Sequence, residues 1–127
     1  MPVQYAQTSG SLSTNAAQFT PIPGLAIALP EGDAITVPVI LNLPNPYAEG
    51  DNYPGATIGL SVDGKISPVV ASFTYNEQKP ASSGRIPTTL VVGIPLTLNE
   101  QKIVAVWCGV RGSTVKLDSP ATLSAVF

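Results

Sequence analysis

Proline and glycine interrupt this chain from one end to the other, and this pattern restricts the fold more than any other feature. The 127 residues include 13 prolines and 11 glycines, and no stretch places apolar residues at i, i+3, i+4 and i+7 for three turns. Proline breaks helix interiors and is confined to the edges or ends of strands. Short apolar runs recur between these interruptions, which predicts an all-β sandwich or barrel in one domain, 1–127.

The apolar runs give the expected strands. The sequence "VDGK" places Asp63 and Gly64 between two such runs, which predicts a type I′ hairpin because both residues tolerate positive φ. Residues 43–55, "LPNPYAEGDNYPG", carry three prolines and are expected to form a long loop, not a central strand. The predicted strands cover residues 3–8, 17–21, 24–29, 34–42, 56–62, 66–75, 88–97, 102–109, 113–117 and 121–127.

Charge is scarce in this chain, and its scarcity excludes several classes of function. Only 11% of the residues are charged, with six lysines and arginines and a net charge of −2. Nucleic-acid binding needs clustered cations to displace counterions, so we expect no nucleic-acid partner. The apolar runs are far shorter than the roughly 20 residues of a membrane helix, so we expect no membrane insertion. The start, "MPVQYAQTSG", lacks the basic and apolar regions of a signal peptide, which predicts cytoplasmic synthesis and, for a secreted protein, non-classical export.

Catalytic and metal-binding chemistry also has few candidates. The chain has no histidine, which excludes a serine–histidine triad and a histidine metal site, and Cys108 is expected to be a small buried apolar residue. An enzyme that hydrolyses glycosides with a pair of carboxylates stays open as a hypothesis, ranked third after the two that are given below. Glu49, Asp51 and Asn52 could offer oxygens to calcium, although turn-forming residues in a solvated loop are the commoner explanation. We therefore expect no cofactor, no metal and no catalytic residue.

Two arginines lie in loops rich in small and hydroxyl side chains. Arg85 follows two serines in "PASSGR", and Arg111 lies between glycines in "GVRGST". Arginine presents five donors in a rigid fork, and tyrosine combines an apolar face with a polar tip, so these groups suit a polyhydroxylated ligand. Composition alone favours a plain surface charge at Arg85, and Arg111 could equally pair with Asp118. The uncharged last strand, "ATLSAVF", further suggests contact with another subunit.

Three long motifs identify a resemblance. "VILNLPNPYAEGDNYPG", "FTYNEQKPASSGRIPTTLV" and "VRGSTVKLDSPATLSAVF" resemble, in order and with the same loop lengths, the TNF-like fucose-binding lectin domain at the N-terminus of a bacterial (Burkholderia) superlectin. "TPIPGL" echoes the family's "DIPGL", and residues 1–38 otherwise match loosely. The resemblance implies a jelly-roll β-sandwich of the TNF/C1q type. It also implies a homotrimer that binds L-fucose or fucosylated glycans in crevices between protomers, as a lectin and not an enzyme.

The resemblance also implies the residues of the sugar site. One wall of the crevice would carry Tyr47, Ser82, Ser83 and Arg85, and the facing wall of the next protomer would carry Thr74, Tyr75 and Arg111. Asp118 matches a family aspartate that would support Arg111 or make an outer contact. Thr57 stands where the family has a tyrosine, and Tyr53 replaces a nearby phenylalanine. This departure leaves a second hypothesis open, a structural trimerisation module of the phage-fibre or surface-fibre type without sugar binding.

Overall fold

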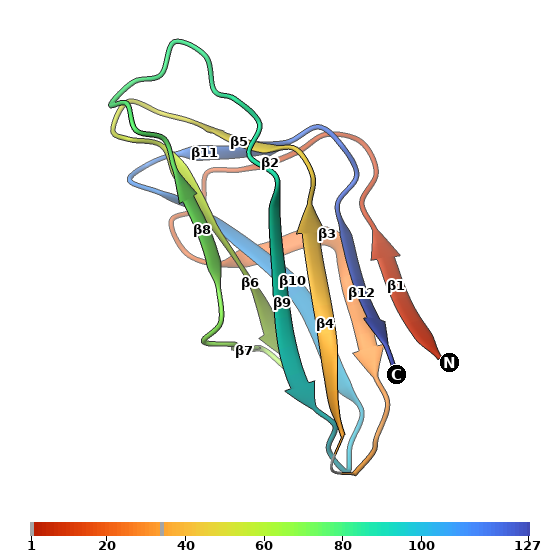
Figure 1. Cartoon of the computed structure of the whole chain (residues 1–127). Coiled ribbons are helices and arrows are strands. Elements are labelled where there is room, and N and C mark those ends of the chain that lie inside the picture. The colour runs from red at the N-terminus through yellow and green to blue at the C-terminus, as the bar shows by residue number, and fades with distance from the viewer. Residues whose placement is uncertain (1, 34) are drawn as a thin grey trace.

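The chain folds into a jelly-roll β-sandwich, as predicted. The computed structural model describes residues 2–33 and 35–127, and these ranges contain strands and no helix, so none of their segments is a helix able to cross a membrane (Figure 1). The strands are β1 (Val3–Gln7), β2 (Leu12–Thr14), β3 (Thr20–Leu29), β4 (Thr36–Leu43), β5 (Pro46–Glu49), β6 (Gly55–Val62), β7 (Lys65–Ile66), β8 (Ala71–Thr74), β9 (Thr88–Pro95), β10 (Gln101–Val110), β11 (Thr114–Leu117) and β12 (Thr122–Val126).

Two main sheets face each other, and a smaller third sheet closes one end of the sandwich. The first main sheet has the order β1-β12-β4-β9, and the second has the order β3-β10-β6-β7 with β8 also paired to β6. The third sheet, β2-β11-β5, lies at the end of the molecule where the loop between β8 and β9 projects (Figure 1). All pairings are antiparallel.

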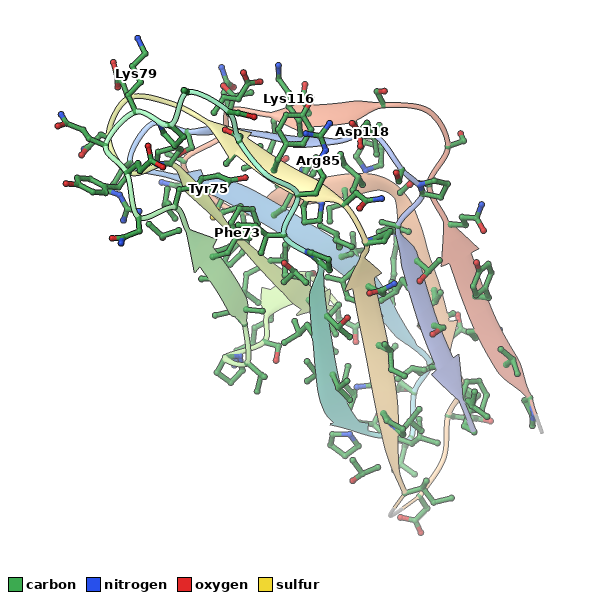
Figure 2. All side chains as sticks on the ribbon, turned by 45° about the horizontal axis from the view of Figure 1, so that its top comes forward. Phe73, Tyr75, Lys79, Arg85, Lys116 and Asp118 are labelled. Atoms are coloured by element: carbon green, nitrogen blue, oxygen red, sulfur yellow. The ribbon has the colours of Figure 1, made fainter. Side chains whose placement is uncertain are left out.

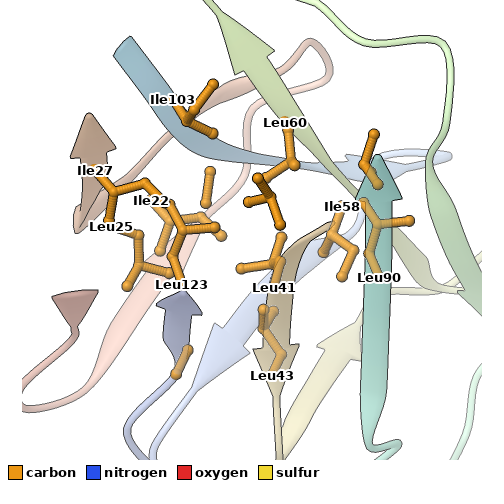
Figure 3. Packing of buried hydrophobic residues seen from close by; sticks show 14 of the residues in the cluster. Ile22, Leu25, Ile27, Leu41, Leu43, Ile58, Leu60, Leu90, Ile103 and Leu123 are labelled. Carbon is orange, nitrogen blue, oxygen red and sulfur yellow. The ribbon is translucent and has the colours of Figure 1, made fainter. Parts of the chain in front are cut away.

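Alternation of side chains along the strands builds the core between the two main sheets. On β4, Val37, Val39, Leu41 and Leu43 are buried while the residues between them are more exposed. Trp107 on β10 is among the largest buried side chains. Leucine and isoleucine side chains from both sheets meet in the centre (Figure 3). This period of two is what the apolar runs predicted.

The turn residues were predicted correctly, but the predicted bounds of some loops and strands were not. Asp63 and Gly64 have φ of 49° and 85°, which confirms the positive-φ hairpin between β6 and β7. The proline-rich stretch 43–55 is mostly loop, but it contains β5, an edge strand that pairs with β11. The predicted strand 66–75 was wrong in extent, because "SPVV" breaks it into β7 and β8. The short strand β2 was missed.

One outer face of the sandwich carries no charged side chain among residues 2–33 and 35–127. This uncharged face is the solvent side of the sheet β1-β12-β4-β9, and it crosses the sheet in a row of register partners from Tyr5 through Ser124 and Ile40 to Val91. Several of its large apolar side chains are exposed. The uncharged face consists of Val3, Tyr5, Gln7, Thr36, Pro38, Ile40, Asn42, Thr89, Val91, Gly93, Pro95, Thr122, Ser124 and Val126.

Candidate functional site

A cavity of about 660 Å³ opens where the loop between β8 and β9 passes over β5 and β11. Four predicted site residues line it together: Tyr47 from β5, and Ser82, Ser83 and Arg85 from the loop. The full lining is Tyr47, Glu49, Gly50, Asp51, Lys79, Pro80, Ala81, Ser82, Ser83, Arg85, Gly112 and Thr114. The fold therefore brings one predicted wall of the sugar site into a single concave surface.

Arg85 is held in a fixed orientation in this wall. Its guanidinium carbon lies 3.8 Å from the centroid of the Tyr47 ring, a cation–π arrangement. Its Nη2 donates to Asp118 Oδ2 at 2.5 Å, and its Nη1 makes a longer bond of 3.4 Å to the Ser83 carbonyl. The hydrogen bond to Asp118 raises the pKa of Arg85, so the guanidinium stays charged. Tyr47 and Asp118 together orient the arginine while leaving it exposed to a ligand.

The pairing of Asp118 with Arg85 corrects one expectation. Asp118 does not support Arg111 within the protomer. The two residues lie at opposite ends of β11, with Arg111 in the turn before the strand and Asp118 directly after it. In Figure 2, Asp118 and Arg85 lie close together at the end of the molecule. The acid therefore offsets the charge of the Arg85 wall.

Ser83 and Tyr75 tie the loop to β5. Ser83 Oγ donates to the Ala48 carbonyl at 2.7 Å. The Tyr75 hydroxyl donates to the Gly84 carbonyl at 2.6 Å and accepts from the Ala48 amide at 3.3 Å. Within the protomer, Tyr75 thus contacts the Arg85 wall, whereas Thr74, its neighbour, contacts Arg111. Successive residues of an extended chain point to opposite sides, which explains the separation.

Arg111 and Thr74 form a second cluster. Arg111 Nη2 donates to Thr74 Oγ1 at 3.0 Å and to the Tyr53 carbonyl at 2.5 Å. Its Nε lies 3.0 Å from the carbonyl oxygens of both Asn52 and Tyr53. Arg111 and Tyr53 both have positive φ, near 50°. Arg111 therefore fixes the loop that ends at β6, in addition to any contact with a ligand.

This role of Arg111 gives a first prediction, on stability. Arg111→Asn should lower the free energy of unfolding by about 1–2 kcal/mol, since charge-assisted bonds to carbonyl groups are lost. Asparagine tolerates positive φ, so the loss reports the contacts and not the backbone. Thermal unfolding should show a fall of about 4 °C, compared with an exposed control, Lys102→Gln. An unchanged melting temperature would contradict this structural role.

Thr57 and Tyr53 are two positions at which the chain departs from the resemblance, and they make different contacts. Thr57 Oγ1 is 2.8 Å from Ser72 Oγ, across the β6–β8 pair, and Thr57 does not line the cavity. Tyr53 is exposed beside the Arg111 cluster. The tyrosine that the resemblance would place at position 57 is thus replaced by a cross-strand hydroxyl pair.

Sequence reasoning did not assign several residues that line the cavity, among them Lys79 and Thr114. Glu49 was considered only as a calcium ligand, but its carboxylate pairs with Lys116 at 2.6 Å and raises the pKa of that lysine. Residues 2–33 and 35–127 contain no group of three side chains that could hold a metal ion. In the sequence, only the closeness of these cavity-lining residues to Tyr47, Ser82 and Arg111 could have indicated their place.

Comparisons with known proteins place these observations in context. The family model described as "Bc2l-C, N-terminal domain" matches residues 3–126. No curated protein matches the chain.

Solved structures with a similar course of the chain share little sequence with it. A CBM36-1 domain of a multidomain xylanase, from the hindgut metagenome of Trinervitermes trinervoides, is 15% identical with a TM-score of 0.48, and the alignment covers 99% of this chain and 98% of that one. The Eiger TNF of S. frugiperda is 13% identical with a TM-score of 0.46, covering 99% and 92%. A carbohydrate-binding module CBM36 in complex with calcium and xylotriose is 14% identical with a TM-score of 0.42, covering 91% and 98%.

Proposed function

Since the chain belongs to the family of the Bc2l-C N-terminal domain, we propose that it is a carbohydrate-binding lectin domain and not an enzyme. Its ligand is L-fucose or a fucosylated glycan, bound in crevices between the protomers of a homotrimer. The observation that carries the proposal is the cavity that Tyr47, Ser82, Ser83 and Arg85 line together in a chain of this family.

The chemistry of the Arg85 wall supports a neutral, hydroxyl-rich ligand. Arg85 is charged and oriented, and its Nε forms no hydrogen bond within the described residues, so it can donate to a hydroxyl or ring oxygen. Ser82 is an exposed residue that lines the cavity, and Ser83 still offers lone pairs to a sugar hydroxyl. Asp118 offsets the positive charge, which lowers the cost of covering the guanidinium with a ligand.

The uncharged face supports the proposed assembly. An exposed sheet face with apolar side chains and no charge is a candidate for burial against a partner. A second copy of the chain is the natural occupant, because interfaces within homo-oligomers are apolar and depleted of charge at their centre. Among the described residues of one protomer, no hydrogen bond joins the Arg85 wall to the Arg111 and Thr74 cluster. Side-by-side copies would bring the two clusters of neighbouring protomers together across a crevice.

The second candidate function is a structural trimerisation module without a ligand. The internal pairing of both arginines favours it, because Asp118 and backbone carbonyls already use several of their donors. The module would share the trimer but bind no sugar.

A ligand test separates the two. L-Fucose at 100 times its dissociation constant should stabilise the lectin by about 2.7 kcal/mol, because it binds only the folded state. Thermal unfolding should therefore show a concentration-dependent rise in melting temperature with L-fucose and none with its enantiomer, D-fucose. A fluorescent glycan array should show signal on fucosylated glycans. A stable trimer with neither response would favour the structural module.

A further inference from the structure

A second cavity opens between β7 and β9, the strands that end their respective sheets. Figure 1 shows both strands on the side of the sandwich away from β1. This edge cavity has a volume of about 280 Å³ and shares no lining residue with the cavity at Arg85. Val62, Pro68, Val92, Ile94 and Gln101 are among the residues that line it. The edge cavity is therefore separate from the proposed sugar site.

The side chains around the edge cavity are mainly apolar. Val92 and Ile94 point inward from β9 and are only 6% and 4% exposed. Lys65 is the one charged residue of the described lining, and it is exposed. A buried water needs two to four polar partners, whereas an apolar cavity stays dry and takes up apolar molecules. The volume lies just below the roughly 300–1,000 Å³ of ligand pockets, which suits a small molecule.

Gln101 adds an unused hydrogen-bond acceptor to this apolar lining. The residue lies at the start of β10, faces the core and is 7% exposed. Its Oε1 is buried and has no hydrogen-bond partner within residues 2–33 and 35–127. A buried acceptor without a donor is costly and rare in folded proteins. Because the terminal torsion of glutamine is broad, the amide can turn to a donor that enters the cavity its side chain lines.

We propose that the edge cavity binds a small, neutral, mainly apolar molecule that carries one N–H or O–H donor, which Gln101 Oε1 accepts. The apolar body of the ligand would pack on Val62, Val92 and Ile94, and its donor would satisfy the buried carbonyl. A charged group would lose its hydration beside these side chains without gaining a charged partner, which excludes an ionised ligand from the base of the cavity. The site goes beyond the proposed lectin function, since it needs neither a sugar nor Arg85.

The test uses two matched probes, indole and benzofuran, on the full chain. The two molecules have nearly the same shape, but indole carries an N–H donor where benzofuran has a ring oxygen. Calorimetry should show that indole binds about tenfold more tightly than benzofuran. In methyl NMR spectra, indole should shift the resonances of Val62, Val92 and Ile94, which line the edge cavity, and leave those of Val115 and Leu117 on β11 unchanged.

A substitution of Gln101 tests the role of the acceptor. Gln101→Leu keeps a side chain of similar size and removes the amide, so the dissociation constants of the two probes should come within about twofold of each other. The melting temperature of the ligand-free variant should rise, because an unpaired buried polar group is gone. The control Gln18→Leu, at an exposed glutamine before β3, should keep both the tenfold preference and the wild-type melting temperature.

Three results would overturn the site. The first is the absence of methyl shifts at Val62, Val92 and Ile94 in the wild type, as expected of a cavity that holds only water. The second is equal affinity of the wild type for indole and benzofuran, which would remove the hydrogen bond from the account. The third is a preference for indole that persists in Gln101→Leu. The first two need only the wild type, so they decide the proposal even if the variant does not fold.

Discussion

Ile40→Glu should convert the assembled protein into folded monomers and abolish binding of L-fucose. Ile40 is 38% exposed in the protomer and lies in the row that crosses the uncharged face, so a glutamate there can be solvated in the monomer. In the proposed trimer it would be buried without a partner in each copy, at a cost of several kcal/mol per charge. Size-exclusion chromatography with light scattering should give the mass of one chain, and circular dichroism should retain the β spectrum.

The chain offers a matched control for this substitution. Ile66, on the other main sheet, is also 38% exposed. Ile66→Glu adds the same charge to a side chain of the same type and exposure, and it should leave both the trimer and sugar binding intact. A trimer that survives Ile40→Glu would show that the uncharged face is not the interface. If the wild type were itself a monomer, the crevice would have no second wall.

Arg85→Ala should weaken binding of L-fucose by at least about 30-fold, which takes a modest affinity out of the measurable range. Truncating a central arginine of a binding surface typically costs about 2 kcal/mol or more. The fold should be little affected, because the ion pair with Asp118 is 42% and 38% exposed and exposed pairs contribute at most about 1 kcal/mol. The measurement is calorimetry with L-fucose, alongside the melting temperature and the mass of the assembly.

Arg85→Lys refines this test. Lysine keeps the charge but lacks the planar fork and the stacking on Tyr47. It should also lose most of the binding, since the proposal assigns recognition to the directed donors of the guanidinium. Binding that persists in Arg85→Ala, with the trimer intact, would remove Arg85 from the site. Binding that persists only in Arg85→Lys would reduce its role to charge alone.

The strands were largely predictable because alternation and turn chemistry are local properties. The period of two on β4 and the positive-φ pair at Asp63 and Gly64 are both visible in the sequence. The short strands β2 and β5 were not, because they hold their places by pairing with β11, a contact between distant segments. Three prolines around β5 concealed it, although an edge strand tolerates proline.

The residues of the candidate site were likewise only partly predictable from the sequence. The resemblance assigned Tyr47, Ser82, Ser83 and Arg85 to one wall, and the fold brings these four residues to one cavity. The partner of Asp118 could not be read from the sequence, since the loop that carries Arg85 reaches it across 33 positions. Because Arg111 is nearer to Asp118 in the sequence, spacing alone made Arg111 the expected partner of this acid.

The most direct test of the lectin proposal is calorimetric titration of the wild-type protein with L-fucose. We predict saturable binding with one L-fucose per protomer, and no heat of binding with D-fucose at the same concentrations. An intact trimer that gives no saturable heat with L-fucose, and no signal on an array of fucosylated glycans, would contradict the proposal.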